Sequence, residues 1–332
     1  MKIGYLGAGA WGFCLARLLA SKKNQVVCWT SNSTLAKKLN EGEEHPHLPG
    51  HPKLPNMHFT TDLAEALDGS EMIVEGITTA GFRPVFTNVK NILVPSCPIV
   101  ITSKGIEQNT GLTIPEVCID IFGENIKKHL AILSGPSYAQ EVVKELPTAV
   151  SGAAFDPKTM AIVCDAFTTQ AFRVYPNSDV KGVAFGGALK NTIAIACGIS
   201  EGLGLGYSSK AALMTRGLHE IRKLALANGC KSETLSGLSG MGDMCLTCGS
   251  LISRNSRFGY LVAQGMTPEE AKKKIEMVVE GAYTCVSALQ ISKPLQIEMP
   301  ITEMVYKIIY EGLPPAKAVK GLMQRTIKEE HL

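Results

Sequence analysis

The sequence predicts a doubly wound α/β domain followed by an all-α domain. Two observations carry this prediction. Short apolar strand candidates alternate with glycine-marked turns up to about residue 175, and helical spacing of apolar residues replaces them afterwards. The chain has 332 residues, 45% hydrophobic and 19% charged, which is an ordinary globular composition. At about 150 residues per domain, two domains are expected. We place the first domain at residues 1–178 and the second at residues 179–332.

The first thirty residues contain a strand, a glycine-rich turn, a helix and a second strand. These elements are expected at residues 2–6 (KIGYL), at Gly7, Gly9 and Gly12, at residues 11–20, and at residues 25–29 (QVVCW). In a G-x-G-x-x-G turn, the first glycine permits the bend, the second lets a pyrophosphate approach the backbone, and the third allows close helix packing. The helix N-terminus then offers unpaired N–H groups to the phosphates. This βαβ context predicts a Rossmann-type dinucleotide-binding domain.

The end of the second strand indicates which dinucleotide binds. An NAD site usually carries Asp or Glu about 20 residues after the glycines, to bind the ribose 2′-hydroxyl. This chain has no acidic residue there before Glu41, so no carboxylate repels a 2′-phosphate. The hydroxyls of Thr30 and Ser31, with Lys37 or Lys38 nearby, could receive that phosphate. The sequence therefore favours NADP(H), with NAD(H) tolerated.

Three further strand candidates end in small or polar residues. They are residues 72–74, 98–102 and 130–133, followed by Thr78-Thr79, Ser103-Lys104-Gly105 and Ser134-Gly135-Pro136-Ser137. Ligands of doubly wound sheets lie outside the carboxyl ends of the strands, so we expect these residues to line the cofactor crevice. Residues 148–152 and 171–175 are expected to extend the sheet.

Strand signals fade after Asp179, and helical spacing takes over. Helices are expected at residues 180–198, 208–228, 267–279 and 301–310. Thr267-Pro268-Glu269-Glu270 has the composition of a helix start, with a capping residue, a proline at the first position and acidic residues in the first turn.

Lys190 lies inside the first of these helices, in the stretch VAFGGALKNTIAIACG. Gly186 and Gly187 lie about one turn earlier on the same face, and glycine costs about 1 kcal/mol in a helix interior. Close helix packing with Lys190 as a surface cation explains the pair. Space for a ligand beside an ammonium group explains it equally well.

Ser253, Arg254 and Asn255 follow a glycine-rich stretch, LSGLSGMGDMCLTCGS. They combine a hydroxyl, a bidentate guanidinium and an amide, which suits phosphate binding. Ordinary polar residues at a helix terminus would give the same pattern.

Composition excludes several other functions. The net charge of +3 is too small to indicate nucleic-acid binding, and the run Lys272-Lys273-Lys274 is typical of a solvated helix face. The chain has no run of about 18 apolar residues, so we expect no stable membrane insertion. It enters a strand directly after Met1, which leaves no room for a signal peptide, and its ten cysteines are then expected to be reduced thiols. We expect a cytoplasmic protein.

Two clusters resemble metal or redox sites on paper. Three histidines lie in residues 45–55 (HPHLPGHPKLP), but no cysteine or glutamate completes a ligand set, and we expect no metal. Cys245 and Cys248 have C-x-x-C spacing without a second pair, and we interpret them as two buried thiols. The sequence does not settle whether they have a redox role.

A longer set of segments resembles one enzyme family. In order, GAGAWG, SKGIE, SGPSYAQEV, LPTAV, GGALKNTIAIACGISEGLGLG, TRGLHEI, GMGDMCLTC, SRNSRFG, VVEG and EMPITE are similar to the bacterial-type NAD(P)-dependent glycerol-3-phosphate dehydrogenases. The resemblance runs from about residue 3 to residue 325. It implies a 6-phosphogluconate-dehydrogenase-like fold. It also implies reversible reduction of dihydroxyacetone phosphate by NAD(P)H to sn-glycerol 3-phosphate, the precursor of the phospholipid backbone.

The resemblance also implies which residues act. Lys190 would be the proton donor or acceptor, in a catalytic set with Lys104 and Asp243. Substrate would be bound by Lys104, Gly135, Ser137, Lys190, Asp243, Ser253, Arg254 and Asn255. The cofactor would be bound by Gly7, Gly9, Trp11, Gly12, Ser31, Lys104, Ala139, Arg254, Val278 and Glu280.

The chemistry of ketone reduction agrees with these roles. The reaction needs a hydride at carbon and a proton at oxygen, and an ammonium group near the carbonyl polarises it and supplies the proton. At an ordinary pKa near 10.4, Lys190 is protonated at neutral pH and ready for reduction. It must lose that proton before oxidation, which predicts faster oxidation at alkaline pH. Lys104 would add electrostatic stabilisation, Asp243 would orient Lys190 or a glycerol hydroxyl, and the phosphate would supply remote binding energy.

One departure from the family concerns the cofactor. Many relatives carry a basic residue after the tryptophan of the second strand, where this chain has Ser31 and then Asn32. Lys37 or Lys38 would have to replace that cation, so the resemblance leaves the choice between NADP and NAD open.

Two other functions remain open. The first is a 3-hydroxyacid or 6-phosphogluconate-type dehydrogenase, in which Arg254 would bind a carboxylate. The second is a cofactor-binding sensor without chemistry, against which intact Lys104, Lys190 and Asp243 argue. The apolar content of the helical domain also permits a homodimer.

Overall fold

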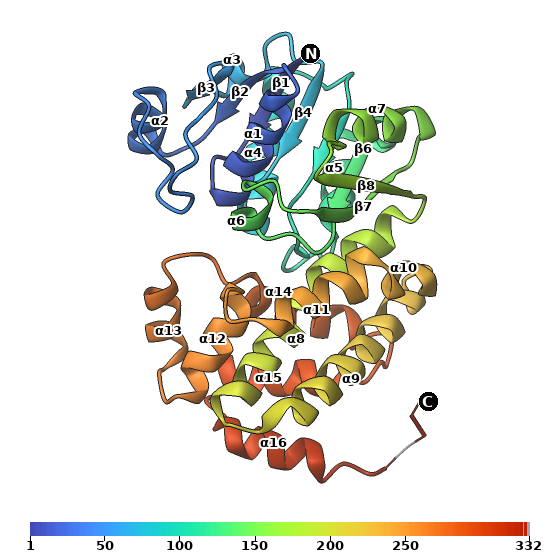
Figure 1. Cartoon of the computed structure of the whole chain (residues 1–332). Helices are drawn as coiled ribbons and strands as arrows, with labels where there is room; N and C mark the ends of the chain where they lie inside the picture. Colours follow the sequence, from blue (N-terminus) through green and yellow to red (C-terminus); the bar gives the residue numbers. More distant parts are fainter. Residues whose placement is uncertain (328, 331–332) are drawn as a thin grey trace. The chain divides into compact units, whose positions relative to one another are not determined.

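The computed structural model describes residues 1–327 and 329–330, which divide into two compact units (Figure 1). The first comprises Met1–Ser103 and Ile114–Val183, and the second comprises Lys104–Thr113 and the chain from Ala184 onward. Each unit has its own hydrophobic core. The segment 104–113 therefore belongs to the second unit although it follows a strand of the first.

The first unit is built on an eight-stranded sheet with the order β3-β2-β1-β4-β5-β6-β7-β8. The strands are β1 (Lys2–Leu6), β2 (Gln25–Trp29), β3 (Met57–Thr60), β4 (Met72–Glu75), β5 (Ile99–Ile101), β6 (Leu130–Ser134), β7 (Thr148–Ala154) and β8 (Phe172–Asn177). Neighbouring strands are parallel except for β6 and β7, which are antiparallel. The first six positions follow the Rossmann order, so the predicted doubly wound fold is confirmed.

Burial explains why most strands could be found in the sequence. The strands β4, β5 and β6 are buried along their whole length, and they are apolar apart from the last residues of β4 and β6, Glu75 and Ser134. β3 was not anticipated, because its four residues, MHFT, alternate an exposed histidine with buried neighbours.

Helices form two groups in this unit. They are α1 (Ala10–Ser21), α2 (Ser33–Asn40), α3 (Leu63–Leu67), α4 (Thr79–Ile92), α5 (Ile114–Phe122), α6 (Ala139–Val142) and α7 (Pro157–Phe167), with a 3₁₀ helix at Glu124–His129. Helix α1 contacts α6 and α7, whereas α4 contacts α3 and α5. This grouping is the helix arrangement expected around a doubly wound sheet.

The second unit contains helices and no named strand among its described residues, as the sequence predicts. They are α8 (Val180–Gly202, which starts in the first unit), α9 (Gly206–Ala227), α10 (Ser232–Ser236), a π-helical turn (Leu238–Gly242), α11 (Asp243–Gly249), α12 (Arg254–Ala263), α13 (Pro268–Ile275), α14 (Glu280–Ser292), α15 (Pro300–Tyr310) and α16 (Pro315–Met323).

The helix start at Thr267 is confirmed, but the helix is shorter than expected. The Thr267 side chain and Glu270 form a reciprocal capping box. The prediction of one helix over residues 267–279 was wrong, because α13 ends at Ile275, where Glu276 takes a left-handed conformation with φ of 56°. A second helix, α14, starts five residues after Ile275, at Glu280.

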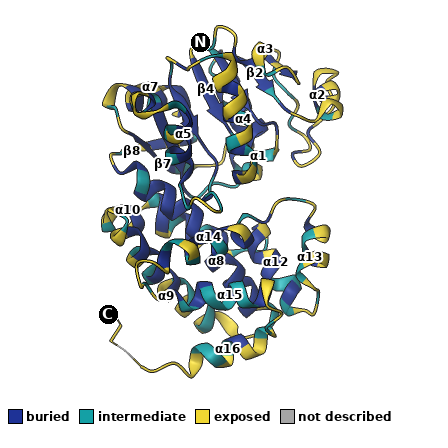
Figure 2. Ribbon diagram, turned by 180° about the vertical axis from the view of Figure 1, so that it is seen from behind, coloured by how far each residue is buried: buried dark blue, intermediate teal, exposed yellow. Residues whose placement is uncertain are grey.

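Helix α8 is the one described helix that is long and apolar enough to cross a membrane by length and composition, with a mean hydropathy of 1.4. The whole of that apolar stretch is buried inside the protein, which is the position of a core helix (Figure 2). Gly186 on this helix lets the π-helical turn approach, because a Cβ there would lie 2.8 Å from the Ser239 carbonyl oxygen. Close packing therefore accounts for Gly186.

Candidate active site

The glycine-rich turn joins β1 to α1 in the first unit. Gly7 has φ of 112°, a conformation that favours glycine, and its N–H donates to the Trp29 carbonyl at 2.9 Å. A Cβ on Gly12 would lie 2.1 Å from the Gly7 carbonyl oxygen, so the third glycine is needed for close packing. A Cβ on Gly9 would meet no protein atom within 4 Å, which marks the open face of the turn.

This turn fits a dinucleotide phosphate. Gly9 caps α1 without a side chain, and the first turn of the helix has no acidic residue. The helix therefore presents its N–H groups and positive dipole end to the open face of the turn. Among the described residues, the buried indole Nε1 of Trp11 has no hydrogen-bond partner. An acceptor on a bound cofactor would satisfy that donor.

Substituting the turn glycines should separate folding from binding. Gly12→Ala forces a Cβ against the Gly7 backbone, and we expect the free energy of unfolding to fall by about 2 kcal/mol, together with cofactor affinity. Gly9→Ala should leave stability unchanged and weaken only cofactor binding, because its Cβ enters the open face. Thermal melts and cofactor titrations measure both effects. A Gly12→Ala protein with the wild-type melting temperature would contradict the prediction.

Hydroxyl and amide groups follow β2, where the cofactor ribose was expected. Ser31 is exposed, while Thr30 is buried and its Oγ1 accepts from the Asn32 N–H at 3.2 Å. Asn32 caps α2 by accepting from Leu35. The two candidate lysines lie on exposed positions of α2 and are paired with glutamates, in the ion pairs Lys37–Glu41 at 3.9 Å and Lys38–Glu43 at 3.4 Å. The expected phosphate cations are thus partly neutralised.

The segment after β6 contributes the other predicted residues of the first unit. Gly135 is required there, because a Cβ would lie 2.8 Å from Cα of Val150 on the neighbouring strand. The Ser137 hydroxyl donates to the Gly135 carbonyl at 3.0 Å. Ala139 begins α6, and its carbonyl accepts from the Cys14 thiol of α1 at 3.4 Å. These contacts tie the segment to the helix that follows the glycine-rich turn.

The second unit brings Lys104, Lys190 and Asp243 together around one carboxylate. Lys190 Nζ donates to Asp243 Oδ1 at 2.9 Å, and Lys104 Nζ donates to Asp243 Oδ2 at 2.6 Å. The exposed fractions of the side chains are 7% for Lys190, 2% for Asp243 and 19% for Lys104. We call these three residues the lysine–aspartate cluster. It holds two cations and one anion, with a net positive charge in a largely buried position.

Burial and neighbouring charges set the acidity of this cluster. Burial lowers the pKa of Lys190, the Asp243 carboxylate raises it, and the Lys104 ammonium lowers it again, leaving a pKa of about 8. Burial opposes ionisation of Asp243, but the two ammonium groups hold its pKa below the ordinary value. The sequence argument assigned Lys190 an ordinary pKa near 10.4, and that assumption was wrong. Lys190 can both donate and accept a proton near neutral pH.

Sequence reasoning missed Thr247, which completes this cluster. Its hydroxyl accepts from Lys190 Nζ and donates to Asp243 Oδ1 at 3.2 Å. Asp243 and Thr247 share one face of α11, at the i, i+4 spacing. That spacing would have revealed the pair if the stretch DMCLTCG had been recognised as a helix rather than as part of a glycine-rich loop.

Ser253, Arg254 and Asn255 lie at the start of α12. The Ser253 side chain caps the helix by accepting from the Ser256 N–H at 3.3 Å. Arg254 is exposed, and its charge interacts with that of Glu280, the first residue of α14. The side chains of this stretch therefore divide between a structural cap and an accessible cation.

Asn255 belongs to a buried amide network that sequence reasoning did not anticipate. Its Oδ1 accepts from the Gly281 N–H at 2.9 Å, and its Nδ2 donates to Asn191 Oδ1 at 2.9 Å. Asn191, the neighbour of Lys190, in turn donates to the Lys104 carbonyl at 3.5 Å. The network joins α14, α12, α8 and the backbone of Lys104. It therefore helps to fix the lysine–aspartate cluster.

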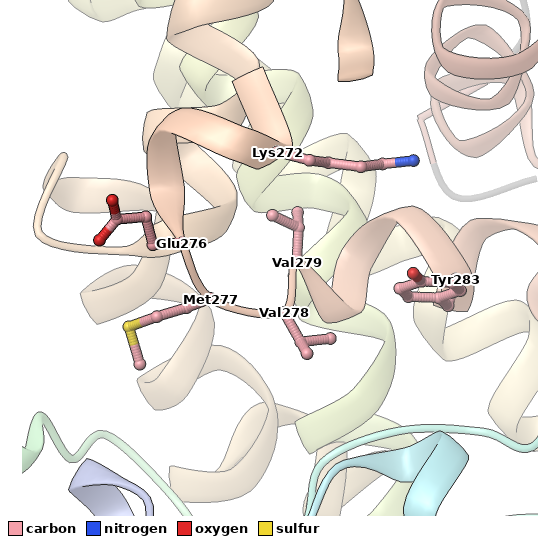
Figure 3. A pocket seen from close by; sticks show the side chains of 6 residues that line it. All are labelled: Lys272, Glu276, Met277, Val278, Val279 and Tyr283. Atoms are coloured by element: carbon pink, nitrogen blue, oxygen red, sulfur yellow. The ribbon is translucent and has the colours of Figure 1, made fainter. Parts of the chain in front are cut away.

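Val278 lies in the connection from α13 to α14, and Glu280 is the first residue of α14. A hollow of about 330 Å³ adjoins this connection and is lined by Lys272, Glu276, Met277, Val278, Val279 and Tyr283 (Figure 3). The side chains of Val278 and Val279 point to opposite sides of the backbone, and Val278 is 38% exposed whereas Val279 is buried. Val278 is thus the accessible member of the pair.

The cysteine pair and the candidate metal ligands found in the sequence form neither a disulfide nor a metal site among the described residues. Cys248 is buried and contacts Cys197, whereas Cys245 is exposed, so the interpretation of Cys245 and Cys248 as two buried thiols was wrong for Cys245. Among the described residues, no group of three or more His, Cys, Asp or Glu side chains has the arrangement of a metal site.

Two family models together cover most of the chain. The model described as the NAD-dependent glycerol-3-phosphate dehydrogenase N-terminus matches residues 2–160, and the corresponding C-terminus model matches residues 179–320. The chain belongs to the NAD-dependent glycerol-3-phosphate dehydrogenase family.

Individual relatives agree with this assignment. The glycerol-3-phosphate dehydrogenase [NAD(P)+] of Protochlamydia amoebophila is 62% identical over 331 residues, covering 100% of this chain and 99% of the relative. The enzyme of the same name from Chlamydia abortus is 54% identical with the same coverage. Among solved structures, glycerol-3-phosphate dehydrogenase from Coxiella burnetii superposes with a TM-score of 0.93 at 37% identity, covering 98% of this chain and 99% of that one. The predicted resemblance is confirmed, and the chain is an NAD(P)-dependent oxidoreductase.

Proposed function

We propose that this member of the glycerol-3-phosphate dehydrogenase family reduces dihydroxyacetone phosphate reversibly to sn-glycerol 3-phosphate, with Lys190 as the proton donor. The observation that carries the role of Lys190 is its buried ammonium group, held by Asp243 at 2.9 Å with a pKa of about 8. A general acid–base group works best when its pKa lies near the operating pH. The product would supply glycerophospholipid synthesis.

In this mechanism NAD(P)H supplies the hydride for the carbonyl carbon when it is bound. Lys190 gives a proton to the carbonyl oxygen, and in the oxidative direction its neutral amine takes the proton back. Lys104 adds a second positive charge that stabilises the developing alkoxide. Asp243 keeps both ammonium groups in place through its two oxygens and completes the proposed catalytic set.

The other sequence-predicted residues keep their proposed roles. Substrate contacts come from Lys104, Gly135, Ser137, Lys190, Asp243, Ser253, Arg254 and Asn255. Cofactor contacts come from Gly7, Gly9, Trp11, Gly12, Ser31, Lys104, Ala139, Arg254, Val278 and Glu280. Arg254 is an exposed residue, and its planar guanidinium, whose pKa is lowered by burial and raised by Glu280, suits an anionic group.

Initial-rate kinetics tests the proposed reaction. Purified protein is assayed with dihydroxyacetone phosphate and, separately, with 3-oxo acids, each with NADPH and with NADH. Turnover of the ketose phosphate supports the proposal. Faster turnover of a 3-oxo acid would favour a carboxylate substrate, and cofactor binding without any turnover would favour a sensor.

Cofactor choice depends on the exposed position after β2. We propose a slight preference for NADPH, because Ser31 leaves room for a 2′-phosphate and no acidic residue precedes Glu41. Ser31→Asp should lower kcat/KM for NADPH at least tenfold and change that for NADH by less than about twofold, because the new carboxylate repels only the phosphate. Ser31→Asn is the uncharged control. Equal losses with both cofactors would place Ser31 away from the ribose.

Domain boundaries, assembly and location are further proposals. The dinucleotide-binding domain is proposed to span residues 1–178 and the substrate domain residues 179–332. A homodimer is supported by exposed apolar side chains on the helical unit, among them Tyr207, which is 92% exposed at the start of α9. Light scattering measures the assembly. A cytoplasmic location is proposed from the reduced cysteines, and cell fractionation tests it.

A further inference from the structure

The histidine- and proline-rich stretch has no role in the proposed reaction, yet it is attached along the length of α1. We define residues 45–56 as the His/Pro loop. His45 Nε2 lies 3.1 Å from the Ala8 carbonyl oxygen, in the turn that precedes α1. Arg17 Nε, in the middle of α1, donates to the Pro52 carbonyl at 3.2 Å. Asn56 Nδ2 donates to the Ala20 carbonyl, near the end of the helix, at 2.8 Å. The loop thus runs beside α1 and begins at the glycine-rich turn.

The two hydrogen bonds of His45 define its protonation state. A carbonyl oxygen only accepts, so Nε2 must carry the proton donated to Ala8. The His47 backbone N–H donates to Nδ1 at 3.2 Å, so Nδ1 must be unprotonated. The imidazole is therefore neutral and in its Nε2–H tautomer. It is only 1% exposed, and its ring packs against that of Phe13 with centroids 5.0 Å apart.

The position of Ala8 gives this hydrogen bond a consequence for ligand binding. Ala8 is the residue between Gly7 and Gly9, and glycine-flanked backbone loses much conformational freedom when it is fixed. Among the described residues, none beyond its chain neighbours comes within 4 Å of a Cβ built on Gly9, so the hydrogen bond from His45 holds the turn at a point away from this open face. Fixing a turn before the ligand arrives raises affinity, because the ordering cost has already been met.

We propose that His45 is a positioning residue for dinucleotide binding, which as a neutral imidazole holds the Ala8 carbonyl and thereby fixes the glycine-rich turn. This inference rests on the proposed function, because it requires the turn to bind a dinucleotide. The ligand class is the pyrophosphate of NAD⁺ or NADP⁺. His45 itself need not touch the cofactor.

The same geometry makes cofactor binding sensitive to acid. Burial lowers the pKa of His45 below its ordinary value, the bond to Ala8 raises it, and the neighbouring His47, with ring centroids 5.8 Å apart, lowers it. Other charged residues of this region include Glu44, which precedes His45, Lys53, which donates to the Met57 carbonyl, and Arg17 of α1, which donates to the Pro52 carbonyl.

Protonation of His45 at Nδ1 would place a second N–H opposite the His47 backbone N–H, and the hydrogen bond between them would be lost. Because the folded-state pKa is lowered, the neutral form persists at and above pH 6.5, and it is lost as the pH falls through the lowered value.

Calorimetric titration of three variants tests the proposal. The ligand is whichever of NAD⁺ and NADP⁺ the wild-type protein binds more tightly at pH 7.5, and Kd is measured between pH 5 and pH 8. His45→Gln can keep both hydrogen bonds and stays neutral. His45→Phe keeps the ring packing and loses both bonds. His58→Gln is the matched control, because His58 is an exposed histidine of the same unit that pairs with Glu65 at 3.2 Å.

We expect His45→Phe to raise Kd about three- to tenfold at pH 7.5, the factor for losing the one hydrogen bond that reaches the glycine-rich turn. His45→Gln should match the wild type within about twofold at pH 7.5 and lack the extra weakening that the wild type shows at pH 5. His58→Gln should behave as the wild type throughout. Titration of the cofactor phosphate affects all four proteins equally. A difference between proteins in the ratio of Kd at pH 5 to Kd at pH 7.5 therefore reports the protonation of His45.

Two results would overturn the inference. One is a His45→Phe protein with wild-type Kd at pH 7.5, and the other is a His45→Gln protein with the wild-type pH ratio. If His45→Phe does not fold, as judged by its thermal melt, the pH ratio of His45→Gln decides alone. A wild-type protein that binds neither cofactor would remove the dinucleotide assignment itself, a different failure from wild-type binding that is indifferent to His45.

Discussion

Replacing Lys190 by alanine is expected to lower kcat for dihydroxyacetone phosphate reduction by about a thousandfold, within the range of general acid catalysis. The cofactor Kd should change by less than about twofold, because the hydrogen bonds of this side chain go to Asp243 and Thr247. Lys190→Arg should lower kcat by nearly as much, since a guanidinium keeps the charge but does not release its proton. Lys273→Ala, an exposed lysine of α13, is the control.

The pH profile of the wild-type enzyme tests the same lysine without a substitution. With a pKa of about 8, the fraction of neutral Lys190 rises tenfold per pH unit below that value and levels off above it. The kcat/KM for glycerol 3-phosphate oxidation should follow this rise, and the kcat/KM for reduction should fall above pH 8. The rise of oxidation and the fall of reduction with pH should both disappear in the Lys190→Ala variant. A residual activity that kept the wild-type profile would assign the proton transfer to another group.

The first strands and the glycine-rich turn could be predicted from the sequence, because short apolar strands and spaced glycines are local patterns. The apolar runs of β1 and β2 lie on either side of the glycine-rich turn, and their bounds were predicted correctly at residues 2–6 and 25–29. The turn itself could be recognised because Gly7 and Gly12 are each required by backbone geometry. Local sequence therefore predicts these strands although β1 is buried on both faces from Ile3 onward and β2 alternates buried residues with more exposed ones.

The candidate site could be recognised only in part, because its properties arise from contacts distant in sequence. Lys190 was identified, but its lowered pKa depends on Asp243, 53 residues later, and on Lys104, which lies 139 residues before Asp243. Asn255 was predicted to bind substrate and stays a prediction, but nothing in its local sequence indicated that its amide bonds to Asn191, 64 residues away. No local spacing encodes such pairs, and only the packing of α8, α11 and α12 reveals them.

Replacing Asp243 by asparagine should have the largest effect on stability. The change leaves the ammonium groups of Lys104 and Lys190 close together without their shared carboxylate, in a largely buried position. Removing one partner of a buried ion pair typically costs about 3 kcal/mol or more. We therefore expect the free energy of unfolding to fall by about 3 kcal/mol near pH 7, measured by denaturant titration.

The direction of the pH dependence distinguishes this explanation from a simple packing defect. Without the carboxylate, the pKa of Lys190 should fall below 8, because burial and Lys104 both disfavour its charge. The unfolded chain then binds more protons than the folded one between that lowered pKa and about 10.4, so stability should rise with pH across this window. A loss of unfolding free energy that is independent of pH would contradict the charge explanation.

A second substitution provides the matched control. In Asp243→Asn/Lys104→Met only one buried ammonium group remains, and we expect part of the lost stability to return. Lys104→Met alone should move the midpoint of the oxidation pH profile to higher pH, because removal of the neighbouring positive charge raises the pKa of Lys190. Asp243→Asn should move that midpoint to lower pH, because loss of the carboxylate lowers the pKa of Lys190. Opposite shifts from two residues that bond to each other at 2.6 Å would follow only if both act on the proton of Lys190 through their charge.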